Sequence, residues 1–370
     1  MVSEVILAVS DLKRHYAAPG MWFRRARPVI RAVDGVSFSL KSGETFSVVG
    51  ESGCGKTTLS RMILDLEKST SGEVSYQRKD LAKLRGADYR EYRTSVQAVF
   101  QDPTTSLDPR RRIRSIVAEP LIVNTQLRGA ALQDRVDALM RSTGLDPAVG
   151  KFFPHELSGG MRQRVAVAQA LALNPKIILL DEPVSSLDVS IRAQIMNLLK
   201  DLQQEFGVAY ILIAHDLGTV RYLSHQIAAM YVGQFVEQGA SEKIFTEALH
   251  PYTISLISAV GSTDRLRTGR IVLKGEPASP AAPPPGCRFH SRCWLREQLG
   301  SPERCTSTQP ELRPVTAPDH LVACHFSEKL ADPSRRAERI GIAVAGSSLA
   351  PEGGLERRTP ITATPAVPQS

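Results

Sequence analysis

The stretch Gly50-Glu51-Ser52-Gly53-Cys54-Gly55-Lys56-Thr57 decides the fold of this chain. It follows the apolar run Thr45 to Val49 and precedes residues that favour a helix from about Lys56. Glycines in such a loop let backbone N–H groups point at the α- and β-phosphates of a nucleotide, and the helix N-terminus adds positive partial charge. The Lys56 side chain can reach the β- and γ-phosphate oxygens, and the Thr57 hydroxyl can bind Mg²⁺. The stretch therefore predicts a site for a nucleoside triphosphate.

Length and composition limit the classes of protein to which the chain can belong. Its 370 residues are enough for about two domains. Apolar runs such as Ile177 to Leu180 are far below the roughly 18 residues of a transmembrane helix, and Met1 to Val9 lacks the parts of a secretion signal. The net charge of +8 is compatible with nucleic acid, anionic lipid or an acidic partner. We therefore expect a cytosolic protein whose partner is not determined by charge.

Strand and helix signals alternate along the chain, which predicts the α/β class with a largely parallel sheet and crossover helices. The expected strands are Val5 to Val9, Val36 to Leu40, Glu73 to Tyr76, Val96 to Phe100, Ile177 to Leu180 and Val208 to Ile213. Residues 103–174 have a mostly helical pattern. The basic segment Ala17 to Pro28 is interpreted as a solvated loop, and a membrane or partner contact through Trp22 and Phe23 is the alternative.

A second motif is Ile177-Ile178-Leu179-Leu180-Asp181-Glu182, an apolar strand that ends in two adjacent carboxylates. Successive residues of a strand project differently, so Asp181 can hold Mg²⁺ through water while Glu182 faces the γ-phosphate and the attacking water. An apolar strand before acids is, taken alone, also compatible with an ordinary helix cap. The phosphate loop upstream favours the metal and base roles.

A third motif is Leu157-Ser158-Gly159-Gly160-Met161-Arg162-Gln163, before a helix predicted from about Arg162 to Leu173. Ser158 is a natural N-cap, and the two glycines leave the helix N-terminus open to a second phosphate contact. A simple capped helix is the alternative explanation of this motif.

In this order and spacing the three motifs resemble those of the ATP-binding subunit of an ATP-binding-cassette (ABC) transporter. The resemblance implies an ABC-type P-loop ATPase with a RecA-like core, an antiparallel β subdomain and a helical subdomain at about 103–174. It places the ATPase domain at 1–260 and a C-terminal extension at 261–330. Residues 331–370 lack any period and are rich in Arg, Pro, Thr, Gly and Ala, so we expect a disordered tail there.

Further residues match the family one at a time. Gln101 matches the glutamine that contacts Mg²⁺ and the attacking water and senses the membrane subunit, and His215 matches the switch histidine at the γ-phosphate. Tyr16 matches the aromatic residue that stacks on adenine. Met161 stands where the family usually has glutamine, from which we expect fewer polar contacts near the dimer interface and no loss of activity. The predicted catalytic residues are Glu182, His215 and Gln101. The predicted magnesium ligands are Thr57, Gln101 and Asp181. The predicted nucleotide-binding residues are Tyr16, Gly50, Glu51, Ser52, Gly53, Cys54, Gly55, Lys56, Thr57, Thr58, Ser158, Gly159, Gly160 and Asp188, the last of which belongs to the Ser186-Leu187-Asp188 loop that crosses the dimer interface.

The resemblance also implies how ATP and partner subunits are used. ATP would lie between the phosphate loop of one subunit and the Ser158 to Gly160 helix start of its partner. Each motif occurs once, so the chain would pair with itself or with a sibling ATPase. Longer runs resemble ATPases of dipeptide and oligopeptide importers, whose relatives also take up nickel. These runs are Val33-Asp34-Gly35-Val36, Val99-Phe100-Gln101-Asp102-Pro103, Ser106-Leu107-Asp108-Pro109, Ala214-His215-Asp216-Leu217 and His250-Pro251-Tyr252-Thr253.

The importer resemblance predicts a peripheral protein on the cytoplasmic face of the inner membrane. Its partners would be two transmembrane permeases and, indirectly, an extracytoplasmic solute-binding protein, with no nucleic acid. The loop at 17–28 is similar to the second of the two ATPases in such importers, which favours a heterodimer. The solute is not predicted, because its path lies in other subunits. A soluble ABC ATPase acting on ribosomes or nucleic acid is the alternative, although two cassettes or a long coiled coil, usual in that class, are not visible.

Four of the five cysteines follow a Pro-rich linker, Pro277 to Pro285; they are Cys287, Cys293, Cys305 and Cys324. Disulfides are not expected in a reducing cytosol. Four thiolates could hold Zn²⁺ or an iron–sulfur cluster of the 4Fe-4S type, and we favour the cluster; free structural thiols are the alternative. Cys54 is interpreted as part of the phosphate loop and not as a metal ligand.

Overall fold

The computed structural model describes residues 4–17, 29–185, 187–259 and 270–332, together with 334, 336, 338–340 and 343. The basic segment at 18–28, Ser186 and most of the expected tail at 331–370 lie outside the described residues. The described strands form two sheets, one with the order β2-β1-β4-β5 and one with the order β11-β12-β10-β9-β3-β8-β7-β6. Among the described residues no helix is both long and apolar enough to cross a membrane.

The first sheet is antiparallel and is dominated by two long strands, β1 (Val5–Ala17) and β2 (Val29–Lys41). It is completed by β4 (Ser71–Tyr76) and β5 (Lys79–Asp80). Strands were expected here, but β1 and β2 extend well beyond the apolar alternation that predicted them. The reason is a series of register shifts, one of them between Val9 and Leu12, where Asp11 has a φ of 44°. A bulge of this kind breaks the two-residue period while pairing continues.

The second sheet carries the parallel core that was predicted. β3 (Thr45–Val49), β8 (Ala209–Ala214), β7 (Ile177–Asp181) and β6 (Val96–Val99) run parallel to one another. β9 (Gln226–Tyr231) is parallel to β3, and β10 (Gln234–Ala240) turns back antiparallel to β9. The carboxyl ends of parallel strands meet at one edge of a sheet. The phosphate loop, the acidic pair, Gln101 and His215 all follow such strand ends.

Apolar side chains cover both faces of this sheet. Alternate residues of β7 enter two different core clusters: Ile178 and Leu180 pack in one, Ile177 and Leu179 in the other. The helices that flank the strands are α1 (Lys56–Ile63), α2 (Gly86–Ser95), α7 (Val189–Phe206) and α8 (Leu217–Leu223). Burial on both faces explains why these strands read as continuous apolar runs.

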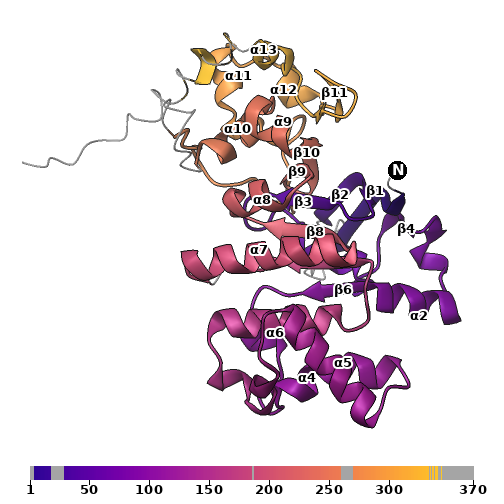
Figure 1. Cartoon of the computed structure of the whole chain (residues 1–370). Coiled ribbons are helices and arrows are strands. Elements are labelled where there is room, and N and C mark those ends of the chain that lie inside the picture. Colours follow the sequence, from indigo (N-terminus) through magenta and orange to yellow (C-terminus); the bar gives the residue numbers. More distant parts are fainter. Residues whose placement is uncertain are drawn as a thin grey trace, which may run out of the picture.

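Residues 103–171 supply the predicted helical segment. It contains α3 (Pro103–Ser106), α4 (Ile113–Asn124), α5 (Gly129–Ser142), α6 (Gly159–Leu171) and the 3₁₀ turns at Pro147–Lys151 and Pro154–Glu156. In Figure 1, α4, α5 and α6 lie together at one end of the molecule, below β6. α6 begins at Gly159, three residues before the predicted start at Arg162, because Ser158 is its N-cap and both glycines fall in the first turn.

The C-terminal extension packs on the opposite end and shares the second sheet (Figure 1). Its two-residue strand β12 (Leu321–Val322) pairs with β10 and with β11 (Arg313–Pro314). Its helices and those leading to it are α9 (Ser241–Glu247), α10 (Pro251–Ser258), η4 (His290–Arg292), α11 (Trp294–Gln298), α12 (Arg304–Ser307) and α13 (Glu328–Ala331). Beneath it, Glu237 and His320 form a fully buried pair with 2.8 Å between Oε1 and Nε2.

Candidate nucleotide site

The phosphate loop joins β3 to α1. Its Lys56 is buried, and the ammonium donates to the carbonyl oxygens of Gly50 at 2.8 Å and of Glu51 at 3.0 Å. Gly55 has a φ of 112°, and a Cβ there would lie 2.1 Å from the Ala32 carbonyl oxygen, so only glycine fits. The loop backbone thus surrounds the Lys56 ammonium and packs at Gly55 directly against β2.

The other loop residues divide by exposure. Ser52, Gly53 and Thr57 face solvent, whereas Cys54 is buried. The Cys54 sulfur lies 3.8 Å from the Lys56 ammonium, and burial raises the pKa of the thiol. Cys54 therefore packs beneath the loop as a neutral thiol. The exposed Thr57 hydroxyl at the first turn of α1 is accessible to a cation.

The three side chains predicted to be catalytic come together from three strand ends. Glu182 follows β7 with a φ of 48°, and its N–H donates to the Ile213 carbonyl in β8 at 2.8 Å. Gln101 Nε2 donates to Glu182 Oε2 at 2.8 Å, and His215 Nδ1 lies 3.1 Å from Glu182 Oε1. The left-handed turn at Glu182 aims its carboxylate between the ends of β6 and β8.

Asp181 provides the neighbouring carboxylate. It is partly buried, and desolvation, with a further contribution from the Glu182 charge, raises its pKa, while Lys56 and Arg61 act in the opposite direction. Two adjacent carboxylates of which one is poorly solvated form a site that a divalent cation stabilises. The Asp181 carboxylate and the Thr57 hydroxyl are both oxygen donors of the kind that Mg²⁺ binds, so the donor set fits this ion.

The serine–glycine motif is built for close packing. Ser158 Oγ accepts a hydrogen bond from the Met161 N–H at 3.3 Å, and both Ser158 and Gly159 are exposed. A Cβ on Gly160 would lie 2.5 Å from the Ile191 Cγ2 atom of α7. Met161 packs against the apolar core. The motif therefore presents a serine hydroxyl and backbone N–H groups to solvent at the start of α6.

The two remaining predicted nucleotide contacts lie at element ends. Tyr16 stands near the end of β1, partly exposed, and the Arg14 guanidinium lies 4.5 Å from its ring centroid. Asp188 is the exposed N-cap residue of α7. Among the described residues, no hydrogen bond or ion pair joins Tyr16 or Asp188 to Gln101, Glu182 or His215.

Comparisons with known proteins assign the family. An ABC transporter family model matches residues 33–185, and the model of the oligopeptide/dipeptide transporter C-terminal region matches residues 236–299. The oligopeptide transport ATP-binding protein AppF of Bacillus subtilis is 43% identical over 87% of this chain and 98% of that protein. The dipeptide transport ATP-binding protein DppF of Escherichia coli is 43% identical over 90% of this chain and 98% of that protein. The chain belongs to the ABC transporter family. It is an ABC-type ATPase subunit that binds ATP.

Solved ABC structures share the fold. The cassette CbiO1 of Clostridium perfringens, part of a cbiONQ complex, aligns with a TM-score of 0.58 at 30% identity, covering 66% of this chain and 92% of that chain. A dimeric ATP-binding cassette, MJ0796, in a post-hydrolysis state with ADP and Pi, aligns with a TM-score of 0.56 at 30% identity, covering 64% and 99%. The expected class, an α/β P-loop ABC cassette, is confirmed.

The four cysteines of the extension of this ABC ATPase line one small cavity of about 20 Å³, together with His290 and His325. All are free thiols, and burial raises the pKa of Cys287 to about 11 and of Cys324 to about 12. Such a volume holds about one water molecule. Among the described residues no group of three or more His, Cys, Asp or Glu is arranged to hold a metal ion. The soft donor set suits a thiophilic metal, although the described residues do not arrange three of these donors around one metal position.

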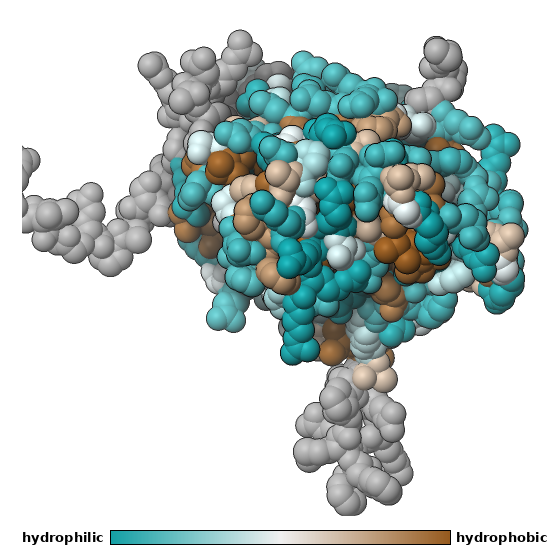
Figure 2. Space-filling model, turned by 60° about the horizontal axis from the view of Figure 1, so that its bottom comes forward, coloured by the Kyte–Doolittle hydropathy of each residue, from teal (hydrophilic) through white to brown (hydrophobic). Residues whose placement is uncertain are grey.

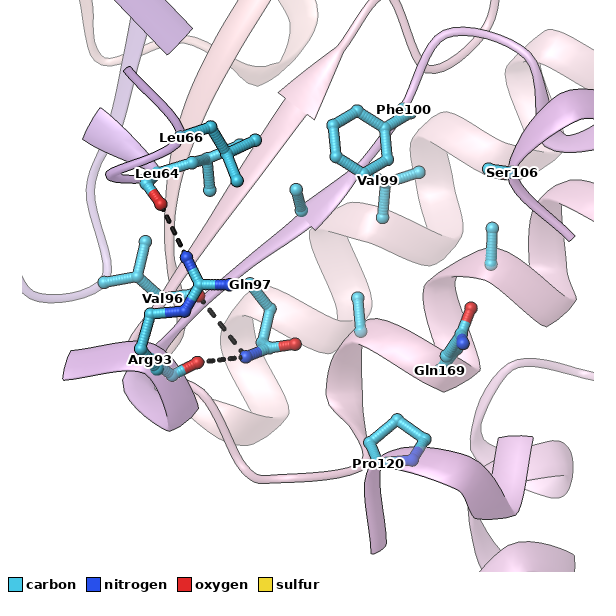
Figure 3. A pocket seen from close by; sticks show the side chains of 13 residues that line it. Leu64, Leu66, Arg93, Val96, Gln97, Val99, Phe100, Ser106, Pro120 and Gln169 are labelled. Carbon is cyan, nitrogen blue, oxygen red and sulfur yellow. Dashed lines mark hydrogen bonds between the residues drawn. The ribbon is translucent and has the colours of Figure 1, made fainter. Parts of the chain in front are cut away.

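A groove of about 380 Å³ lies between the sheet of the ABC core and the helical segment (Figure 3). Leu66 and Phe100 line it and are 56% and 44% exposed. Arg93 stiffens one wall by donating to the Leu64 carbonyl at 2.7 Å, and Gln97 Nε2 donates to the Arg93 carbonyl at 2.6 Å. Figure 2, with the helical end turned forward, shows separate apolar patches on a mainly polar surface.

Sequence reasoning missed one set of contacts entirely. Glu51 of the phosphate loop is bound by Arg292 and Tyr252, which lie far along the chain. Tyr252 was noted only as part of a family-like run, and no local pattern distinguishes Arg292.

Proposed function

We propose that this ABC ATPase powers the import of dipeptides or oligopeptides, or of a related solute such as nickel, through a membrane transporter. The observation that carries the proposal is the joint match of a cassette at 33–185 and an oligopeptide/dipeptide transporter C-terminal region at 236–299. The two relatives described above are named for peptide transport, and their alignments with this chain span 98% of each relative. A cassette that acts on ribosomes would not need that C-terminal region.

The roles proposed for the site residues follow from their contacts. Glu182 polarises the attacking water, because among the described residues its carboxylate contacts Gln101 and His215 and no Lys or Arg side chain. Gln101 and His215 hold the two oxygens of that carboxylate and so fix its direction. Lys56 leaves the Gly50 and Glu51 carbonyls to meet the β- and γ-phosphates. Thr57, Gln101 and Asp181 would hold Mg²⁺, and the ion would offset negative charge on the phosphate oxygens.

Two cassettes are needed to complete two sites in this proposal. The Ser158 to Gly160 motif occurs once. Its Ser158 and Gly159 are exposed at the helical end, where they can contact ATP held on the loop of a partner. Asp188, the exposed N-cap residue of α7, is proposed to face the partner. The partner is a sibling ATPase in a heterodimer or a second copy of this chain. The dimeric state of the MJ0796 cassette with ADP and Pi supports this arrangement.

The groove in Figure 3 is the proposed contact for a permease. Its exposed apolar side chains suit an apolar cytoplasmic helix, and Phe100 is adjacent in sequence to Gln101. A shift of the groove wall would therefore reach the hydrogen bond from Gln101 to Glu182. Attachment through two permeases would hold the chain peripherally at the cytoplasmic face of the membrane, with a solute-binding protein on the other side.

Co-purification and uptake test this function. The full chain is expressed together with candidate permease subunits of a peptide importer, and the membrane fraction is assayed for bound chain and for ATP-dependent uptake of labelled dipeptide and nickel. We expect recovery with the permeases and uptake that Glu182→Gln abolishes. Glu205→Gln, an exposed carboxyl on α7, is the matched control. Recovery only with ribosomes would overturn the proposal.

A metal at the four cysteines stays a separate proposal that rests only on their convergence on one cavity. Iron and zinc analysis of anaerobically purified chain tests it directly. Stoichiometric iron, with a visible absorbance of the protein that is lost when all four cysteines are replaced by serine, would support a cluster. Zinc alone would support the alternative. Absence of both metals would establish the thiols as structural.

A further inference from the structure

The C-terminal extension reaches back to the phosphate loop at Glu51. Arg292 Nη1 donates to Glu51 Oε2 at 2.7 Å and Nη2 donates to Oε1 at 3.1 Å. Two parallel bonds of this kind fix direction as well as distance. On the backbone side, the Glu51 N–H donates to the Tyr252 hydroxyl at 2.8 Å. Tyr252 and Arg292 lie outside residues 33–185, which match the ABC transporter family model. Together they therefore hold both the side chain and the main chain of Glu51.

The groups that hold Glu51 are themselves firmly placed. Tyr252 is fully buried, and its ring centroid lies 4.8 Å from that of Tyr231 and 5.4 Å from that of Phe289. The Trp294 indole N–H donates to the Pro251 carbonyl at 3.2 Å, which ties α11 to α10. The Arg292 side chain is 7% exposed, and its Nε donates to the Lys274 carbonyl. These contacts leave the phenol and guanidinium little freedom.

A second arginine of the extension supports the opposite side of the loop. Arg288 donates to the Asp34 carboxylate and to the Val232 carbonyl. The next residue, Gly233, donates its N–H to the Cys54 carbonyl of the phosphate loop at 2.8 Å. Arg288 thus fixes the turn between β9 and β10 on which the loop rests. The extension contacts the loop directly through Arg292 and indirectly through this turn.

We propose that the C-terminal region matched at 236–299 is a working part of the ATP site, in which Arg292 and Tyr252 are positioning residues for the phosphate loop. They touch Glu51 and not the nucleotide, so their effect passes through the loop. Glu51 also offers its carbonyl to Lys56 at 3.0 Å, so a displaced Glu51 would move the acceptor that orients the lysine. The guanidinium further offsets a carboxylate that would otherwise add negative charge beside the triphosphate.

Arg292→Gln in the full-length chain tests the proposal. Calorimetry gives the Kd for ATP with Mg²⁺, and steady-state hydrolysis by the assembled dimer gives KM and kcat. We expect Kd and KM to rise about tenfold, the scale of one hydrogen bond to a charged group, with kcat nearly unchanged. The matched control is Arg313→Gln, which breaks another arginine–carboxylate bridge of the extension, with Glu328, that does not involve the loop. It should leave Kd and KM at the wild-type values.

Three further variants separate positioning from a loss of folding. Adding Glu51→Gln to Arg292→Gln removes the unpaired charge and should recover part of the affinity, and Arg292→Lys should give an intermediate KM. Tyr252→Phe keeps the ring and removes only the acceptor of the Glu51 N–H, so it should raise Kd in the same direction. Wild-type Kd in both Arg292→Gln and Tyr252→Phe overturns the proposal. An unchanged KM also overturns the proposal, whether the variant shows only a lower melting temperature or a lower kcat.

Discussion

Replacing Glu182 by Gln is the most direct test of the chemistry assigned to this ABC ATPase. The amide has nearly the same shape, so it can still accept from Gln101 through its oxygen, at the place where Oε2 now lies 2.8 Å from Nε2. It cannot take a proton from water. A positioned general base contributes about 10²- to 10⁴-fold to a rate. At about 1.36 kcal/mol for each tenfold change, the barrier should rise by about 3 to 5 kcal/mol.

The assay must separate binding from hydrolysis. Full-length variant is assembled with its ATPase partner, kcat is measured by phosphate release, the Kd for ATP by calorimetry, and dimer formation by light scattering with and without nucleotide. We expect near-wild-type Kd, a kcat lower by about 10² to 10⁴, and a dimer that persists in ATP and Mg²⁺. Glu205→Gln controls for the loss of a carboxylate elsewhere. A kcat within tenfold of wild type, or a dimer that ATP does not strengthen, would refute the assigned base and the shared site.

Three further predictions concern stability. His320→Leu leaves Glu237 buried without its partner and should lower the free energy of unfolding by about 3 to 5 kcal/mol in denaturant titrations. Burial lowers the pKa of His250 to about 3, so between pH 6.5 and 3 the unfolded chain binds a proton that the native chain does not. The free energy of unfolding should therefore fall as the pH is lowered, by up to about 1.4 kcal/mol per pH unit. The variant His250→Gln should show a smaller dependence of this free energy on pH. Gly160→Ala places a methyl group 2.5 Å from an Ile191 carbon and should cost about 1 to 3 kcal/mol, measured as a lower thermal midpoint.

The parts of the site that the sequence predicted are those with local signals. Lys56 follows a glycine-rich loop between a strand and a helix, and Glu182 ends an apolar strand. Parallel strands place their carboxyl ends together, so the meeting of Glu182, Gln101 and His215 followed from three separate strand assignments. The left-handed φ of Glu182 had no such signal, because a glutamate rarely adopts that conformation. Their catalytic roles stay a prediction.

The parts that were not predicted depend on contacts distant in sequence. Arg292 and Glu51 are 241 positions apart, and neither lies in a pattern that specifies the other. The extension is placed by two-residue strands such as β12, and a strand of that length has no readable alternation. The pairing of Glu237 with His320 depends on the same placement. The length of β1 was underestimated because the bulge near Asp11 interrupts the period.

On the proposals above, control of this ATPase is divided between two carboxylates, Glu182 and Glu51. Glu182 is held by Gln101, which adjoins the groove wall at Phe100, so on our proposal an event in the groove would act on the group assigned to activate water. Glu51 is held by Arg292, so the extension acts on the loop that binds phosphate. The first route would then change how fast bound ATP reacts, and the second how tightly ATP binds. Because the two routes share no side chain, a groove variant and an extension variant should combine with additive free energies, one expressed in kcat and the other in KM.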